Sequence, residues 1–82
     1  MEINDCVLEA AAAIGAPGRV WLFLDNFGYN TDSGEWFFEV SGCDNPIFLA
    51  EMRAMKAWAL EICDWLQYQY SEGPIRVQER NA

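Results

Sequence analysis

The sequence predicts an α+β fold, a single small domain in which a sheet packs on one long helix. Two apolar segments suited to strands, residues 19–29 and 35–41, are separated by a short turn that contains Gly34. A long stretch then runs from residue 46 to about residue 70 and repeats its large apolar side chains every three or four positions. The chain has 82 residues, which suffice for one hydrophobic core, so we expect residues 1–82 to form one domain. The expected order of elements is α-β-β-α-β.

The first predicted element is a helix over residues 4–14. Asn4 or Asp5 can cap its N-terminus, because both side chains accept hydrogen bonds from the free N–H groups of a first turn. Four consecutive alanines favour the helix, and Gly15 is expected to end it. Its apolar residues recur at helical spacing and form one thin face: Val7, Ala10, Ala11 and Ile14.

The two apolar segments that follow are predicted to pair as an antiparallel hairpin. Both are rich in the β-branched and aromatic residues that strands favour. Gly34 can adopt the positive φ that a three-residue hairpin loop with a bulge requires. This loop sets the register, which pairs Thr31 with Glu35, Tyr29 with Phe37, Phe27 with Glu39, and Asp25 with Ser41.

Because strand side chains alternate between two faces, this register predicts one apolar face and one mixed face. The apolar face is expected to meet the core and consists of Val20, Leu22, Leu24, Trp36, Phe38 and Val40. The mixed face combines large aromatic side chains with carboxylates: Trp21, Phe23, Asp25, Phe27, Tyr29, Glu35, Phe37 and Glu39. Two alternatives stay open for its aromatic residues, which are burial in the core and exposure at an interface.

The long helix is expected to begin at Pro46, with Asn45 as its N-cap. Its core stripe consists of Phe48, Met52, Met55, Ala59, Ile62 and Leu66. Its polar side consists of Arg53, Lys56, Asp64 and Gln67. Residues 75–79 alternate apolar and polar side chains and are predicted to form a short third strand beside the first.

The charge of the chain excludes several classes of partner. Thirteen acidic residues stand against five basic ones, and the formal net charge is −8. Because phosphate groups repel such a surface, we expect no direct binding to nucleic acid and none to anionic membranes. The N-terminus is acidic where a signal peptide would be basic, and no long apolar segment follows, so the expected location is the cytoplasm.

The sequence lacks the residue patterns that most enzymes and metal sites use. It contains no histidine, the commonest general base and metal ligand, and no phosphate-binding glycine loop or nucleophile elbow. Its three cysteines, Cys6, Cys43 and Cys63, are too widely spaced for a zinc site or a disulfide framework. We therefore expect a protein that is not an enzyme and that holds no cofactor and no metal.

Two features of the predicted surface indicate protein binding. Carboxylates occur in every predicted element with few basic neighbours, and the hairpin carries more aromatic surface than so small a domain can readily cover. Such a surface suits a basic partner, because charge steers the encounter and aromatic contacts hold it. Generic solubility is the alternative explanation for the acidic residues. The predicted partner-binding residues are Asp25, Phe27, Tyr29, Asp32, Glu35, Phe37 and Glu39.

This profile resembles the small acidic anti-CRISPR proteins of bacteriophages and mobile elements. The resemblance covers the whole chain as size, charge, α+β pattern and missing catalytic motifs, and it carries over no individual residue. It implies an inhibitor that occupies the basic nucleic-acid-binding groove of a CRISPR effector in the cytoplasm of a bacterial host. Immunity proteins and antitoxins that neutralise basic nucleases share the profile and form one alternative. A structural homodimer whose tryptophans seal the interface forms another.

Overall fold

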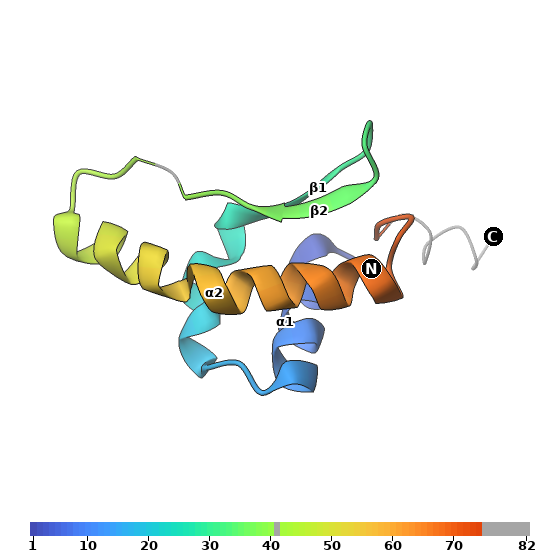
Figure 1. Cartoon of the computed structure of the whole chain (residues 1–82), viewed down its shortest axis with the longest axis horizontal. Coiled ribbons are helices and arrows are strands. Elements are labelled where there is room, and N and C mark those ends of the chain that lie inside the picture. The colour runs from blue at the N-terminus through green and yellow to red at the C-terminus, as the bar shows by residue number, and fades with distance from the viewer. Residues whose placement is uncertain (41, 75–82) are drawn as a thin grey trace.

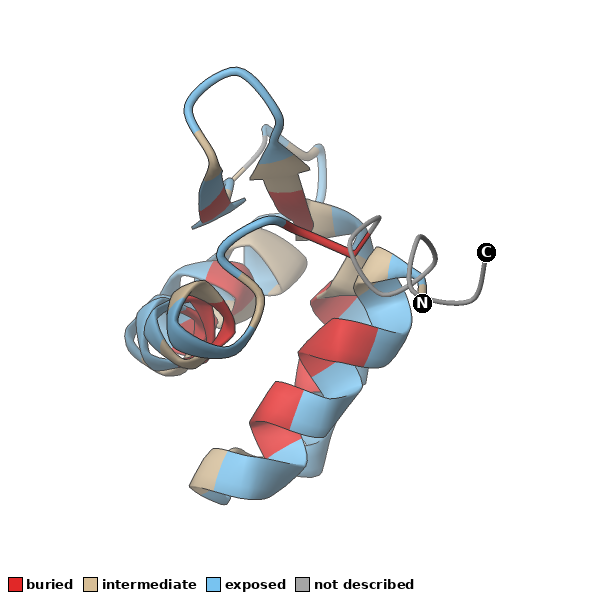
Figure 2. Cartoon of the chain, turned by 90° about the vertical axis from the view of Figure 1, so that its right-hand side faces the viewer, coloured by how far each residue is buried: buried red, intermediate tan, exposed pale blue. Residues whose placement is uncertain are grey.

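Five elements follow one another in the computed structural model, which describes residues 1–40 and 42–74 (Figure 1). They are α1 (Ile3–Ile14), the 3₁₀ helix η1 (Gly18–Asn26), β1 (Phe27–Asn30), β2 (Glu35–Phe38) and α2 (Pro46–Gln69). The hairpin lies on one side of α2, and α1 with η1 lies on another (Figures 1 and 2). The predicted α+β class is confirmed. Within the described residues the sheet has two antiparallel strands, and the third strand predicted at residues 75–79 lies outside them.

α1 confirms the first predicted helix, although its N-terminal cap differs. The helix begins at Ile3 and its N-cap is Glu2, so the predicted caps, Asn4 and Asp5, lie inside the first turn. It ends as predicted at Gly15, whose φ of 73° is the left-handed conformation that glycine adopts most readily. Three residues of the predicted apolar face are buried: Val7, Ala10 and Ala11.

Most of the predicted first strand, residues 19–29, is instead the 3₁₀ helix η1, so that prediction is wrong over most of its length. The backbone of Phe23, with φ of −118° and ψ of 21°, is non-helical and kinks η1, and the side chains of Val20 and Phe23 are buried in the core. Leu22, which was expected in the core, is 40% exposed, and Trp21 is 61% exposed. A short continuous apolar run fits a strand or a buried helical turn equally well, and packing against α1 and α2 decides between them.

The hairpin loop is one residue longer than predicted, which shifts the register of the two strands. It contains four residues rather than three, because Asn30 pairs with Glu35. Gly34 has the expected positive φ of 72°, and its N–H donates to the Asn30 carbonyl at 2.7 Å. The Asn30 side chain accepts hydrogen bonds from the backbone N–H groups of Asp32 and Ser33, which stabilises the longer loop.

This shift moves every side chain of β1 to the face opposite the predicted one. Phe27 lies opposite Phe38 and Tyr29 lies opposite Trp36, with ring centroids 4.8 and 5.3 Å apart. All four aromatic side chains therefore face the core. The predicted inward face of β2 is confirmed, whereas the predicted outward position of Phe27 and Tyr29 is wrong.

α2 confirms the predicted long helix, its cap and its core stripe. The Asn45 side chain accepts hydrogen bonds from the N–H groups of Ile47 at 2.9 Å and Phe48 at 3.2 Å. Pro46 occupies the first helical position, where its missing N–H costs nothing. Phe48 is half-buried, and the rest of the stripe is buried: Met52, Met55, Ala59, Ile62 and Leu66.

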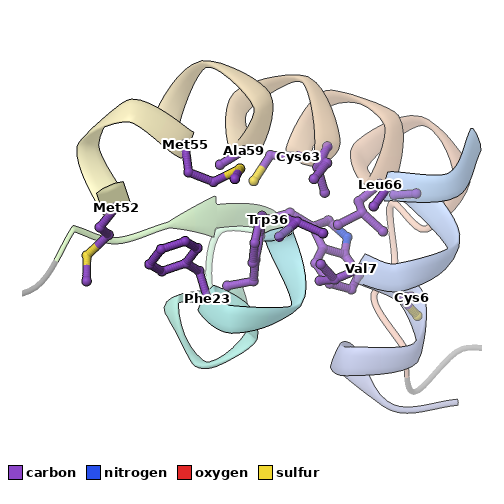
Figure 3. Close-up of a cluster of buried hydrophobic side chains, with 14 residues drawn as sticks. Cys6, Val7, Phe23, Trp36, Met52, Met55, Ala59, Cys63 and Leu66 are labelled. Carbon is purple, nitrogen blue, oxygen red and sulfur yellow. The ribbon is translucent and has the colours of Figure 1, made fainter. Parts of the chain in front are cut away.

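One hydrophobic core joins the elements of the described chain (Figure 3). The core stripe of α2 packs in one cluster with Val7 from α1, Phe23 from η1 and Trp36 from β2. Cys6 and Cys63 belong to this cluster as free thiols. The hairpin is thereby fixed to α2 through its inner side chains, and its other face is left toward solvent.

Candidate functional site

The structure divides the seven predicted binding residues between the core and the surface. Phe27 is buried, and Tyr29 is half-buried with its hydroxyl donating to the Ser71 carbonyl at 2.9 Å. Their position in the core corrects the prediction that they share one face with the carboxylates. The remaining five are exposed: Asp25, Asp32, Glu35, Phe37 and Glu39.

Three of these five stand side by side on the outward side of the hairpin. We term this side the outer face; it consists of Glu35, Phe37 and Glu39, with Gly28 and Asn30 opposite them on β1. At about 3.4 Å per residue, the two glutamates stand about 14 Å apart along the strand, with Phe37 between them. Asp32 lies beyond them in the exposed loop, and Asp25 lies in η1.

Phe37 rests on Gly28, and this contact fixes the aromatic ring on the outer face. A Cβ at residue 28 would lie 2.5 Å from Cζ of Phe37, so only glycine leaves room for the ring in this position. The side chain is still 42% exposed. An aromatic ring held flat against the backbone loses little conformational freedom when it contacts a partner. The outer face therefore offers one rigid apolar contact between two carboxylates.

Hydrogen bonds hold both ends of the outer face. At the loop end, the Gln67 side chain of α2 accepts from the Trp36 N–H at 3.0 Å and donates to the Gly34 carbonyl at 2.8 Å. At the other end, Asn26 accepts from the Glu39 N–H at 2.9 Å, and its side chain donates to the Glu39 carbonyl at 2.8 Å. The backbone that presents the carboxylates is thus ordered before any partner arrives.

Sequence reasoning missed the role of Gln67, which was assigned to the polar side of the long helix. It follows Leu66 of the core stripe by one position, which places it about 100° around the helix, at the edge of the buried face. A polar residue at that edge gives a weak signal of a contact with another element. Only the position of the hairpin identifies the backbone groups that it binds.

The hairpin lies in a segment without basic residues. No lysine or arginine occurs between Arg19 and Arg53, whereas six acidic residues do. Among the described residues one ion pair is formed, and it joins Arg19 to Glu51 near the end of this segment. The carboxylates of the outer face therefore have no basic side chain in the described structure to neutralise them. They create a local negative potential that extends about one Debye length, roughly 8–10 Å, at physiological salt.

Two shallow hollows lie along α2 on the side of α1 and η1. The first, of about 220 Å³, has an apolar floor with the Arg19–Glu51 pair at its rim, and it is lined by Pro17, Arg19, Phe23, Glu51, Ala54, Met55 and Trp58. The second is more open and is lined by Ile14, Glu61, Asp64 and Trp65. Trp58 and Trp65 are half-buried in these walls and pack against the core, so they offer limited free surface for an interface.

Two of the three cysteine side chains, Cys6 and Cys63, are buried and poorly suited to nucleophilic chemistry. Burial raises the pKa of the Cys63 thiol to about 11, and the charge of Asp64 adds to the shift. Burial also raises the pKa of Cys6. Both thiols stay protonated at neutral pH, and the thiolate is the reactive form. Within residues 1–40 and 42–74, no three Cys, Asp or Glu side chains gather closely enough to hold a metal ion.

Comparisons with known proteins add no family to this description. No family model, curated protein sequence or solved structure matches the chain. Across the described part of the chain, no helix is long and apolar enough to cross a membrane.

Proposed function

We propose that the protein is a non-enzymatic inhibitor that binds the basic nucleic-acid-binding groove of another protein, as small anti-CRISPR proteins do. The observation that carries the proposal is the outer face, where Glu35 and Glu39 flank the half-exposed ring of Phe37 and form no ion pair with any residue that the structure describes. Asp32 extends the same charge to the loop tip. A CRISPR effector or a basic nuclease has the groove chemistry that this face fits.

Charge and packing play different parts in this binding. The carboxylates take the place of nucleic-acid phosphates and attract lysine and arginine side chains, which raises the association rate and makes it fall with salt. Phe37 acts at short range, where packing governs the dissociation rate. The hydrogen bonds from Gln67 and Asn26 keep the face in one conformation, so little ordering is needed on binding. In this proposal the protein acts in the cytoplasm of a bacterial host.

The proposal is tested by competition between the protein and nucleic acid. Purified RNA-guided effectors and nuclease toxins are incubated with a labelled nucleic acid, and fluorescence anisotropy reports its displacement by the protein. We expect displacement from at least one basic groove, and weaker displacement as the salt concentration rises. Failure to displace nucleic acid from any effector or toxin, at low salt and with protein in excess, would contradict the proposal.

Variants of the outer face locate the binding site. Glu35→Lys with Glu39→Lys should slow association with the displaced effector and flatten its salt dependence. Glu2→Lys with Asp5→Lys makes the same change in net charge at the start of α1 and should have a smaller effect, since both residues are exposed and neither belongs to the outer face. Phe37→Ala should instead speed dissociation. Equal effects of the two double variants would mean that overall charge, and not the outer face, governs the inhibition.

A further inference from the structure

One side of α2, next to the hollow that Ile14 of α1 lines, is exposed along its length. Four residues on this side recur at spacings of four, three and four, which is the heptad spacing of a helix seam. We term them the α2 stripe: Arg53, Ala57, Leu60 and Asp64. All four are exposed, and Leu60 is 53% exposed. An exposed leucine in the middle of such a seam is suited to contact with another helix.

The exposed charges of α2 from Arg53 to Asp64 are segregated along the helix. Arg53 and Lys56 lie in its N-terminal half, and Glu61 and Asp64 lie in its C-terminal half. The two basic residues are three apart, and so are the two acidic ones, so each finds a like charge at the distance where side chains on a helix meet. Among residues 1–40 and 42–74, none of the four forms an ion pair. The helix therefore leaves these charges to be satisfied from outside.

The α2 stripe is complementary to itself when it is reversed. In an antiparallel pair of helices centred between Ala57 and Leu60, Arg53 faces Asp64 of the second copy. Ala57 then faces Leu60 of the second copy, so a small side chain makes room for a large one. Each contact occurs twice because the arrangement has two-fold symmetry. The basic half of each helix also lies along the acidic half of the other.

We propose that two copies of this chain associate through their α2 stripes, with the helices antiparallel. A single pair of helices of 24 residues, about 36 Å long, gives an interface at the small end of the specific range, so the dimer is reversible and depends on concentration. The hairpin lies on another side of α2 (Figure 2), so both outer faces stay accessible in the dimer. The association does not depend on the proposed inhibitory function, although it would present two acidic faces to a partner.

Sedimentation equilibrium over a range of protein concentrations tests the dimer. We expect a monomer–dimer equilibrium for the wild-type chain. Arg53→Glu places a glutamate against Asp64 of the second copy at both ends of the stripe and should weaken the dimer on the order of tenfold or more. Lys56→Glu makes the same change in net charge on the same exposed side of α2 but off the stripe, and it should weaken the dimer less. Circular dichroism checks that each variant remains folded.

Charge exchange distinguishes this arrangement from other dimers. Asp64→Arg alone should also weaken the dimer, because it then meets Arg53 of the second copy. An equimolar mixture of the Arg53→Glu and Asp64→Arg chains should form a heterodimer, since opposite charges meet again at both ends. The double variant should recover self-association for the same reason. A wild-type chain that stays monomeric, or single variants that neither weaken the dimer nor rescue one another, would overturn the proposal.

Discussion

The two faces of the hairpin share the same eight strand residues and have opposite roles. On the inner face, Trp36 is buried against α2, and its indole N–H donates to the Tyr70 carbonyl at 2.8 Å. On the outer face, Phe37 is half-exposed, and its ring lies against Gly28 of β1. Adjacent aromatic residues of similar hydrophobicity therefore serve stability in one case and a candidate interface in the other.

The loop length, through the register, decides which residues of β1 lie on the same face as Trp36 and which lie on the same face as Phe37. β2 carries aromatic residues at three consecutive positions, Trp36, Phe37 and Phe38, whereas in β1 they alternate with Gly28 and Asn30. The fourth loop residue, stabilised by the Asn30 side chain, sets the register that turns Phe27 and Tyr29 inward. Each of the following substitutions tests this contrast between inward and outward side chains.

The largest contrast is expected between the neighbours Trp36 and Phe37. Trp36→Ala removes a buried side chain and a hydrogen bond, and it should lower the free energy of unfolding by about 3–5 kcal/mol. Phe37→Ala should cost about 1 kcal/mol, because its ring is already half in water. Urea denaturation followed by circular dichroism measures both. Losses of equal size would mean that the faces are not distinguished as described.

The same contrast is expected between the neighbours Phe23 and Leu22 in η1. Phe23 is 1% exposed and contacts the Phe48 ring with centroids 5.1 Å apart, so Phe23→Ala should cost about 3–5 kcal/mol. Leu22→Ala should cost about 1 kcal/mol or less, since Leu22 is largely exposed. The urea concentrations at which the two variants are half unfolded measure the two losses. A strand in place of η1 would reverse the order.

A smaller loss of unfolding free energy is expected when the hydrogen bonds between the Gln67 side chain and the hairpin are removed. Gln67→Ala leaves the Trp36 N–H and the Gly34 carbonyl without their partner, at a cost of about 1–3 kcal/mol. Gln69→Ala is the matched control, because it changes the same residue type on an exposed position of the same helix. If the two variants unfold at the same urea concentration, Gln67 does not hold the hairpin.

The contact between Tyr70 at the end of α2 and Glu9 of α1 predicts a loss of stability at alkaline pH. The Tyr70 hydroxyl donates to the Glu9 carboxylate at 2.5 Å, and this hydrogen bond together with burial raises the pKa of Tyr70 to about 12. Because the folded pKa lies above the unfolded value of about 10, this contribution to stability is complete below pH 10 and is lost as the pH rises to 12.

Tyr70→Phe isolates this effect from the other groups that titrate in the same range. Cys63 also has a raised pKa, about 11, so the wild-type curve contains both contributions. The difference in unfolding free energy between the wild type and Tyr70→Phe should shrink between pH 10 and pH 12. A difference that is constant over this range would show that the Tyr70–Glu9 bond does not persist in solution.

The smallest effect is expected on the outer face itself. Glu35→Gln and Glu39→Gln should each change the unfolding free energy by no more than about 0.5 kcal/mol, because both side chains are exposed. Their carboxylates form no ion pair within the described structure. Thermal or urea unfolding of the two variants measures the change. A large loss would assign these carboxylates to the fold and remove them from the candidate interface.

Features with local causes could be predicted from the sequence. The cap at Asn45 and the end of α1 at Gly15 depend on one residue each, and the core stripe of α2 depends on a periodicity that persists over many turns. The short apolar run from Val20 to Leu24 has neither a single residue that decides its conformation nor a periodicity that persists over many turns. Its conformation is decided by packing against two helices, which the sequence alone does not specify.

The sequence predicted the part of the candidate site whose residues share a face whatever the register of the two strands. Glu35 and Phe37 alternate within β2, and Glu39 continues the alternation one residue past its end, so any pairing leaves the three on one face. The face of Phe27 and Tyr29 was predicted from the loop length. Because the loop is one residue longer than predicted, both side chains point to the opposite face. The self-complementary order of the α2 stripe was readable from spacing, but its exposure required the structure.

The contacts from the end of α2 to the hairpin also affect how the chain emerges during synthesis. Trp36 binds Gln67, which follows it by 31 residues, so the inner face of the hairpin is made well before the helix that covers it. At about 5–20 residues per second, this delay is roughly 2–6 seconds. During that time an aromatic segment with an uncovered edge is exposed to other nascent chains. Glu35 and Glu39 bracket this segment as charged gatekeepers that oppose aggregation, so the carboxylates of the outer face already have a use before any partner is bound.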